Sequence, residues 1–134
     1  MTYKGIELYT KGDQVAVLVS PGFGAGWSTW VWEDEYNSLA YDKRVIDFWL
    51  QHKDDKAFMQ EIDSRYENPT KEETARFFKS LGYDYVYMGG FADIELEWVD
   101  IGVPWTITEY DGHETLLTAN DECFITFGKD DGNV

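Results

Sequence analysis

The sequence predicts an α+β fold, with an N-terminal hairpin, three helices, and then a mostly antiparallel sheet that has the helices packed on one face. Two changes in the spacing of apolar residues support this prediction. Apolar residues alternate near the N-terminus, recur at helical spacing between about residues 39 and 81, and alternate again after Gly82. Strands, then helices, then more strands are typical of helices segregated to one face of an antiparallel sheet.

The opening hairpin is expected within the first 20 residues. Gly5–Tyr9 and Gln14–Ser20 flank the turn-forming triplet Lys11-Gly12-Asp13, and valines alternate along the second of these segments. Pro21 has no amide hydrogen to donate, so strand pairing is expected to stop there. The glycines that follow allow backbone angles that other residues avoid. The stretch after Ser20 is therefore expected to be a loop that leaves the sheet.

Three helices are expected in the middle of the chain. The first spans about 39–52, where apolar residues lie on one face of the cylinder. The second follows Asp54 or Asp55, either of which can cap it. The third, at about 71–81, has a capping-box pattern in Thr70–Glu73 and ends at Gly82, a residue suited to a left-handed terminus.

Strands are expected again after the third helix. The segments concerned are Tyr83–Tyr87, Ile94–Trp98, a hairpin of Pro104–Tyr110 and His113–Thr118 around Asp111-Gly112, and a short last strand at Cys123–Phe127. The Asp-Gly pair favours the primed turn that matches the twist of a hairpin.

Length and charge limit the possible functions. The 134 residues predict a single α+β domain at 1–128 and a flexible acidic C-terminal tail at 129–134. A net charge of -15 predicts repulsion of nucleic acid, so direct nucleic-acid binding is not expected, whereas a basic protein surface would be attracted. The single Cys123, with no leader and no long apolar run, predicts a reducing cytoplasm and no membrane partner.

The stretch SPGFGAGWSTW (Ser20–Trp30), here called the Gly-Trp loop, is the main candidate ligand site. It is not a dinucleotide fingerprint or a P-loop, because Trp27 replaces the third glycine and no Gly-Lys-Ser/Thr closes it. Its amides predict an anion-binding concavity. Its tryptophans could stack on a base, and a nearby basic pair could hold phosphate. The predicted ligand-binding residues are Gly24, Gly26, Trp27, Ser28, Thr29, Trp30, Lys43 and Arg44.

A structural role for the same residues is the alternative. Glycines also permit a tight crossover, and tryptophans are usually well buried, so the loop could simply close one end of the core. Lys43 and Arg44 could equally form a solvated helix face with weak ion pairs.

No catalytic residue, metal site or cofactor is expected. His52 and His113 lack partners at metal-ligand spacing, Cys123 is expected to be an inert thiol, and Ser20 lacks a nucleophile elbow. Asp93, Glu95 and Glu97 share one strand face, where like charges repel, so this face is expected to meet solvent or a basic partner.

Four blocks of the sequence resemble a family of small bacteriophage proteins. They are VLVSPGFGAGWSTW (Val17 to Trp30), LAYDKRVIDF (Leu39 to Phe48), GYDYVYMGG (Gly82 to Gly90) and VPWTITEYDGHE (Val103 to Glu114). The resemblance implies a viral origin and the cytoplasm of an infected bacterial host. Small phage proteins of this kind often antagonise host defence, by occluding a nuclease or by sequestering a nucleotide messenger.

Three hypotheses of function follow, of which a hydrolase or transferase that uses carboxylates ranks last, because the sequence places no pair of them together. The first is a non-catalytic anti-defence protein that sequesters a small nucleotide-type signal through the Gly-Trp loop, in a pocket shared between subunits of a homo-oligomer. The alternative is an acidic protein that mimics nucleic acid and inhibits a basic host protein such as a defence nuclease.

Overall fold

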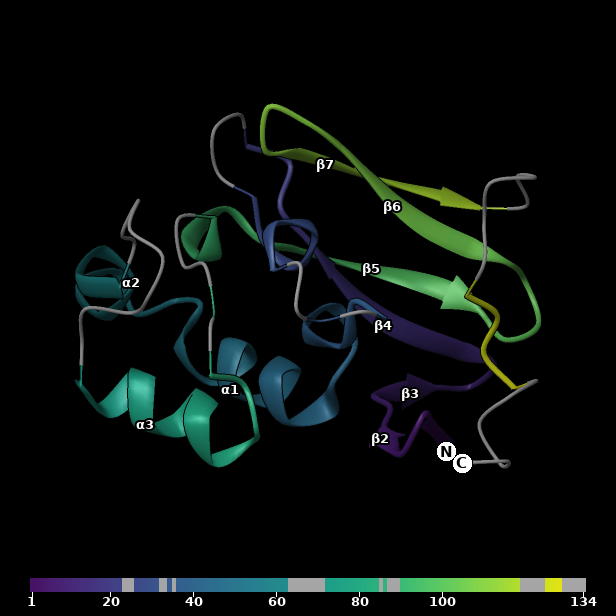
Figure 1. The fold of residues 1–134 in the computed structure, drawn as a ribbon, viewed down its shortest axis with the longest axis horizontal. Helices are drawn as coiled ribbons and strands as arrows, with labels where there is room; N and C mark the ends of the chain where they lie inside the picture. Colours follow the sequence, from purple (N-terminus) through teal and green to yellow (C-terminus); the bar gives the residue numbers. More distant parts are fainter. Residues whose placement is uncertain are drawn as a thin grey trace.

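A computed structural model describes residues 1–22, 26–31, 34, 36–62, 72–84, 86, 90–118 and 125–128. It confirms the α+β class, because helices and antiparallel sheets are both present. Figure 1 shows the helices gathered at one end of the strands, with one hairpin lying above the others. The predicted tail at 129–134 and the predicted site residue Gly24 lie outside the described residues.

The described strands form three antiparallel sheets instead of one. β1 (Thr2–Tyr3) pairs with β2 (Ile6–Glu7), and β6 (Trp105–Tyr110) pairs with β7 (His113–Thr118). Between them lies a sheet with the order β3-β4-β5, made of β3 (Thr10–Lys11), β4 (Gln14–Val19) and β5 (Glu95–Asp100). The β6–β7 hairpin around Asp111-Gly112 confirms the turn that the sequence predicted.

Several predicted strand boundaries need correction. The N-terminal hairpin pairs Thr10–Lys11 with β4, and a separate turn at Lys4-Gly5, both with positive φ, starts the chain. The described residues of 83–87 form no strand, and Tyr83 instead directs its hydroxyl to Ser38 and Asp42. At the far end, Ile125 makes only an isolated bridge, to Trp105. Side-chain contacts in these segments override their alternating pattern.

The helices are α1 (Lys43–His52), α2 (Lys56–Ile62) and α3 (Glu72–Ser80). α1 begins later than predicted, because the Asp42 side chain accepts a hydrogen bond from the Arg44 amide and caps the helix. Gly82, with φ of 98°, follows α3 as predicted. Three short 3₁₀ helices were not predicted: η1 (Ser28–Trp30), η2 (Ser38–Ala40) and η3 (Phe91–Asp93).

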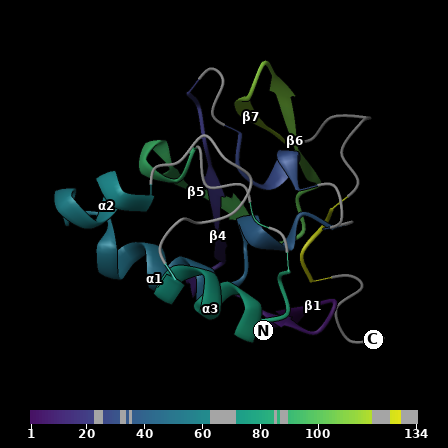
Figure 2. The same cartoon turned by 60° about the vertical axis from the view of Figure 1, so that its left-hand side comes forward.

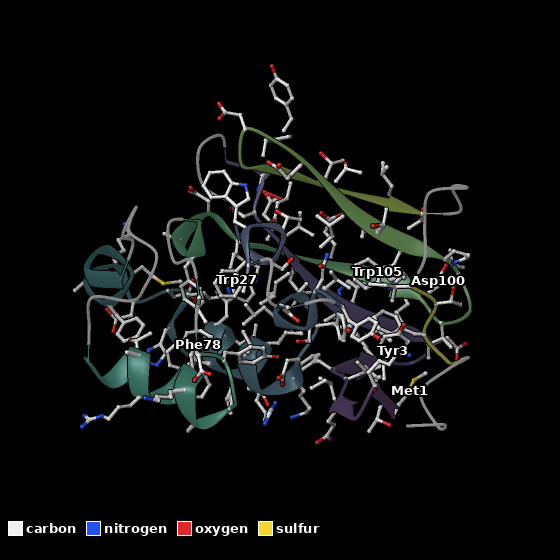
Figure 3. The ribbon with its side chains drawn as sticks, in the orientation of Figure 1. Met1, Tyr3, Trp27, Phe78, Asp100 and Trp105 are labelled. Carbon is white, nitrogen blue, oxygen red and sulfur yellow. The ribbon has the colours of Figure 1, made fainter. Side chains whose placement is uncertain are left out.

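Strand β4 is the centre of the fold, because it is buried on both faces. Ala16 and Leu18 face a core that includes Trp27 and Phe78, on the side of the helices. Val15, Val17 and Val19 face a second core on the side of β6–β7, with Tyr3, Tyr41 and Trp105. Figure 2 shows the helices grouped on one side of β4 and β5, and Figure 3 shows Trp27 and Phe78 well apart from Tyr3 and Trp105.

A hydrogen-bonded network fixes the start of α1. The Asp42 carboxylate, fully buried, accepts from the Arg44 guanidinium at 2.7 Å and from the Tyr83 hydroxyl at 2.9 Å. The neighbouring Tyr41 is also fully buried and donates its hydroxyl to the Tyr36 carbonyl. Burial, reinforced by nearby acidic groups such as Asp34, raises the pKa of the Tyr41 phenol far above its usual value, and burial also raises the pKa of Tyr83.

These two phenols predict a loss of stability at alkaline pH. Above about pH 10 they ionise in the unfolded chain but stay protonated in the folded chain, so the unfolding free energy falls by up to about 1.4 kcal/mol per pH unit for each. Urea unfolding between pH 8 and 11 measures this slope. Tyr83→Phe is expected to reduce the slope, because it removes one of the two phenols whose pKa burial raises. Equal slopes in the wild type and in Tyr83→Phe would contradict the prediction.

Candidate functional site

The Gly-Trp loop leaves the end of β4 and returns towards the β6–β7 hairpin. Ser20 is fully buried, and its carbonyl accepts a hydrogen bond from the Glu114 amide at 2.8 Å. One residue further, the Pro21 carbonyl lies against Nδ1 of His113. η1 then turns the chain at Ser28–Trp30. Described residues of the Gly-Trp loop and of the segment EYDGHE (Glu109–Glu114) therefore meet in space.

The centre of this meeting is the carboxylate of Glu114, which is 2% exposed. Its Oε1 accepts from the Ser20 amide at 3.0 Å, and its Oε2 accepts from the Trp27 amide at 2.9 Å. Oε2 also accepts from the amide and the hydroxyl of Thr29, at 3.1 and 2.5 Å. Amides of Ser20, Trp27 and Thr29 therefore converge on one anionic group, and that group is a carboxylate of the same chain.

The Glu114 charge is compensated by hydrogen bonds. Moving a carboxylate out of water is costly unless donors replace its hydration. Three backbone amides and one hydroxyl supply those donors here, and hydrogen bonds to a charged acceptor are roughly twice as strong as neutral ones. The arrangement is chemically equivalent to an anion-binding loop in its occupied state.

Trp27 and Ser28 are structural residues in this fold. Trp27 has no exposed surface and packs edge-on against Phe78 and Phe91, at ring-centroid distances of 6.2 and 5.3 Å. Ser28 is 1% exposed, and among the described residues neither its hydroxyl nor the Trp27 indole nitrogen has a hydrogen-bond partner. The indole of Trp27 therefore has no exposed face on which a base could stack, contrary to the predicted role of this side chain.

Gly26 is buried beneath the partly exposed side chain of Trp30. A Cβ on Gly26 would lie 2.4 Å from Cγ of Trp30, so the indole covers the glycine backbone directly. Trp30 is partly exposed, and its Nε1 donates to the Glu109 carboxylate at 3.2 Å. Of the two predicted indoles, Trp30 is the one with an accessible face.

Lys43 and Arg44 are engaged by carboxylates next to them in sequence. Lys43 pairs with Asp47 at 2.7 Å across one turn of α1, and Arg44 pairs with the capping Asp42 at 2.7 Å. Both contacts hold a positive charge on the helix surface. The contact with Asp42 also gives the Arg44 guanidinium a structural role at the start of the helix. The alternative interpretation of this pair, a helix face with local ion pairs, describes the structure better than a phosphate contact does.

Glu114 is the residue that sequence reasoning missed, although the hairpin contained a signal for it. A two-residue turn at Asp111-Gly112 fixes the register in which Glu109 lies directly opposite Glu114. Like charges opposite one another destabilise a hairpin. A hairpin in this register is more stable if one of the two carboxylates turns away and accepts hydrogen bonds from another segment. The amides of the Gly-Trp loop supply these hydrogen bonds to Glu114.

The charges of the chain are strongly segregated. Residues 43–79, which include the described helices α1, α2 and α3, carry eight basic and eight acidic side chains. The remainder carries three basic and 18 acidic side chains, and residues 80–128 contain ten acidic residues and no Lys or Arg. The net charge of the protein therefore resides outside the helical segment.

The exposed or partly exposed carboxylates between residues 93 and 111 of this Lys- and Arg-free segment are here called the acidic surface: Asp93, Glu95, Glu97, Asp100, Glu109 and Asp111. In the β4–β5 register Glu95 lies opposite Val19, and Glu97 opposite Val17. Both carboxylates therefore lie on the face of the sheet that carries the β6–β7 hairpin.

Comparisons with known proteins add no identification: no family model, curated protein or solved structure matches the chain. In the described ranges, no three His, Cys, Asp or Glu side chains are grouped so as to hold a metal ion. None of the helices in those ranges has the length and apolarity that crossing a bilayer requires.

The Glu114 contacts predict a large effect from a small change. Glu114→Gln keeps the shape but removes the charge and directs an NH₂ group at amide donors, so we expect the unfolding free energy to fall by about 2–4 kcal/mol. Glu109→Gln, at an exposed position in the same hairpin, should cost about 1 kcal/mol or less. Urea unfolding monitored by tryptophan fluorescence measures both. Similar costs for the two variants would refute the assigned role of Glu114.

The contact between Gly26 and Trp30 predicts a coupled pair. Gly26 does not have a positive φ, so the cost of Gly26→Ala should come from the indole alone, at about 1–3 kcal/mol. In a Trp30→Ala background the same substitution should cost almost nothing, because the added methyl group gains the vacated space. A double-mutant cycle in urea gives the coupling, and additive costs would show that the two residues do not touch.

Proposed function

We propose that this protein is a non-catalytic inhibitor that binds a basic protein through its acidic surface and competes with nucleic acid for that partner. The observation that carries the proposal is the stretch of 49 residues, 80–128, with ten acidic residues and no Lys or Arg. Basic proteins that hold nucleic acid recognise a dense array of negative charge. A folded surface with negative charge and no basic residue of its own presents the same electrostatic feature.

One carboxylate of the acidic surface, that of Glu97, is placed at some cost to the fold. Glu97 is partly buried, and this burial, together with the charge of Glu95 two residues away, raises its pKa. Since the folded state favours the protonated form, ionisation of Glu97 at neutral pH lowers the stability of the fold. A basic partner would relieve that repulsion on binding, which favours a binding role for the charge.

The fold also supplies a rigid base for these charges. Glu95 and Glu97 lie on a strand that pairs along its full length with β4, the most buried strand of the fold. Their spacing is fixed by the strand geometry, at about 6.6 Å between alternate residues. A preorganised array loses less conformational entropy on binding than charges on a flexible tail.

The contacts of the Gly-Trp loop do not favour sequestration of a nucleotide there. A phosphate in that loop would have to displace the Glu114 carboxylate, which has the same sign of charge and is covalently part of the hairpin. Phage origin, the cytoplasm of an infected bacterium and homo-oligomerisation remain expectations from the sequence, and light scattering would measure the last of these.

The proposal predicts salt-sensitive inhibition. A panel of purified bacterial defence nucleases is assayed for DNA cleavage with increasing amounts of the protein. At least one should be inhibited at 50 mM salt, with potency falling at least tenfold by 300 mM, since exposed charges are screened over about 8–10 Å near physiological ionic strength.

Charge reversal locates the surface. Glu95→Lys should weaken the inhibition at least tenfold, because it places a positive charge within the acidic surface. Glu7→Lys, an equal change of charge at an exposed position on β2, is the control and should weaken it less than twofold. Equal effects of the two variants, or no inhibition of any nuclease, would refute the proposal.

A further inference from the structure

The three helices enclose a groove that the acidic surface does not use. One face of α1 lines it with five residues at positions i, i+3, i+4, i+7 and i+8, and α2 and α3 contribute the rest. The lining residues are Arg44, Asp47, Phe48, Gln51, His52, Phe58, Thr74 and Phe77. Its volume of about 410 Å³ lies within the range of small-molecule sites, about 300–1,000 Å³.

Ring faces make up much of the wall. Phe48 stacks on Phe77 with ring centroids 4.2 Å apart, and His52 stacks on Phe58 at 3.9 Å. The centroids of Phe48 and His52 are 4.7 Å apart, so the two stacked pairs form one continuous wall. All four rings are partly exposed. Partly exposed aromatic rings gathered in one groove are typical of a site that binds another planar ring.

The groove also contains a polar group in need of a partner. Thr74 is 1% exposed, and its Oγ1 forms no hydrogen bond with any residue that the structure describes. Native proteins rarely leave a buried hydroxyl unpaired, because the lost hydration is not replaced. The exposed amide of Gln51 adds both a donor and an acceptor to the same lining. A purely hydrocarbon ligand would leave these groups unsatisfied.

Charges at the groove are already paired. The guanidinium of Arg44 is bound by Asp42, and the carboxylate of Asp47 is bound by Lys43. The helical segment 43–79 also has no net charge, in contrast with the rest of the chain. An uncharged ligand therefore fits this lining, whereas a phosphorylated one would meet the negative field of the whole protein.

We propose that the groove between α1, α2 and α3 is a binding site for a purine base, presented as an uncharged nucleoside. The base would stack on the aromatic wall, and its polar edge would pair with Thr74 and Gln51. The site is separate from the acidic surface, so this proposal and the inhibitor proposal can fail independently.

Calorimetry with adenosine, guanosine, cytidine and uridine tests the proposal. At least one purine nucleoside should bind with a dissociation constant below about 1 mM and at least fivefold more tightly than either pyrimidine nucleoside. The corresponding monophosphate should bind more weakly at 20 mM salt and recover at 300 mM, as repulsion from the negative protein is screened. Absence of purine binding, or tighter binding of the monophosphate at low salt, would overturn the proposal.

Two variants assign the binding to the groove. Phe77→Leu keeps an apolar side chain but removes a stacking face, and we expect about tenfold weaker binding. Thr74→Val removes only the hydroxyl and should weaken binding at least fivefold while leaving the folded protein as stable or more stable. Tyr110→Leu removes an exposed ring at the hairpin tip and should bind as the wild type does. Unchanged binding in both groove variants would place the ligand elsewhere and overturn the proposal.

Discussion

The carboxylate of Glu114 and the amides of the Gly-Trp loop form the interaction on which the rest of the structure depends. It links residues 85 to 94 positions apart in the sequence, and joins the β6–β7 hairpin to the end of the central strand. Without it, three backbone amides near the buried indole of Trp27 would have no acceptor, and a charged side chain would be buried without donors. The hairpin therefore supplies the acceptor that the loop amides need. The loop in turn supplies the donors that compensate the charge of Glu114 opposite Glu109.

This interaction also decides where function can reside. A loop of glycines and hydroxyls beside tryptophans has the composition of an anion site, but the carboxylate that its described amides hold belongs to the same chain. The surface available to a partner is then set by charge segregation: a helical segment without net charge, and strands whose exposed carboxylates lack basic neighbours within residues 80–128. The two proposals use these two regions separately, one for a basic protein and the other for an uncharged ring.

Local patterns predicted the parts of the fold that local physics controls. The Asp111-Gly112 hairpin, the end of α3 at Gly82 and the β4 strand followed from turn chemistry and periodicity. The pairing of β4 with β5, the division into three sheets and the burial of Glu114 depend on contacts between distant segments. The sequence did contain one indication that a carboxylate is buried, since the hairpin register places Glu109 opposite Glu114. Nothing local identified which of the two would turn inwards, or which donors would bind it.

Amide hydrogen exchange measured by NMR tests the role of Glu114 most directly. The amides of Trp27 and Thr29 donate to the Glu114 carboxylate, so we expect them to be protected in the wild type. We expect them to lose most of that protection in Glu114→Ala, under conditions where the Val17 amide in the central strand remains protected. Exchange of the Trp27 and Thr29 amides at unprotected rates in the wild type would contradict the account, because the loop would then be open and its concavity free for an external anion.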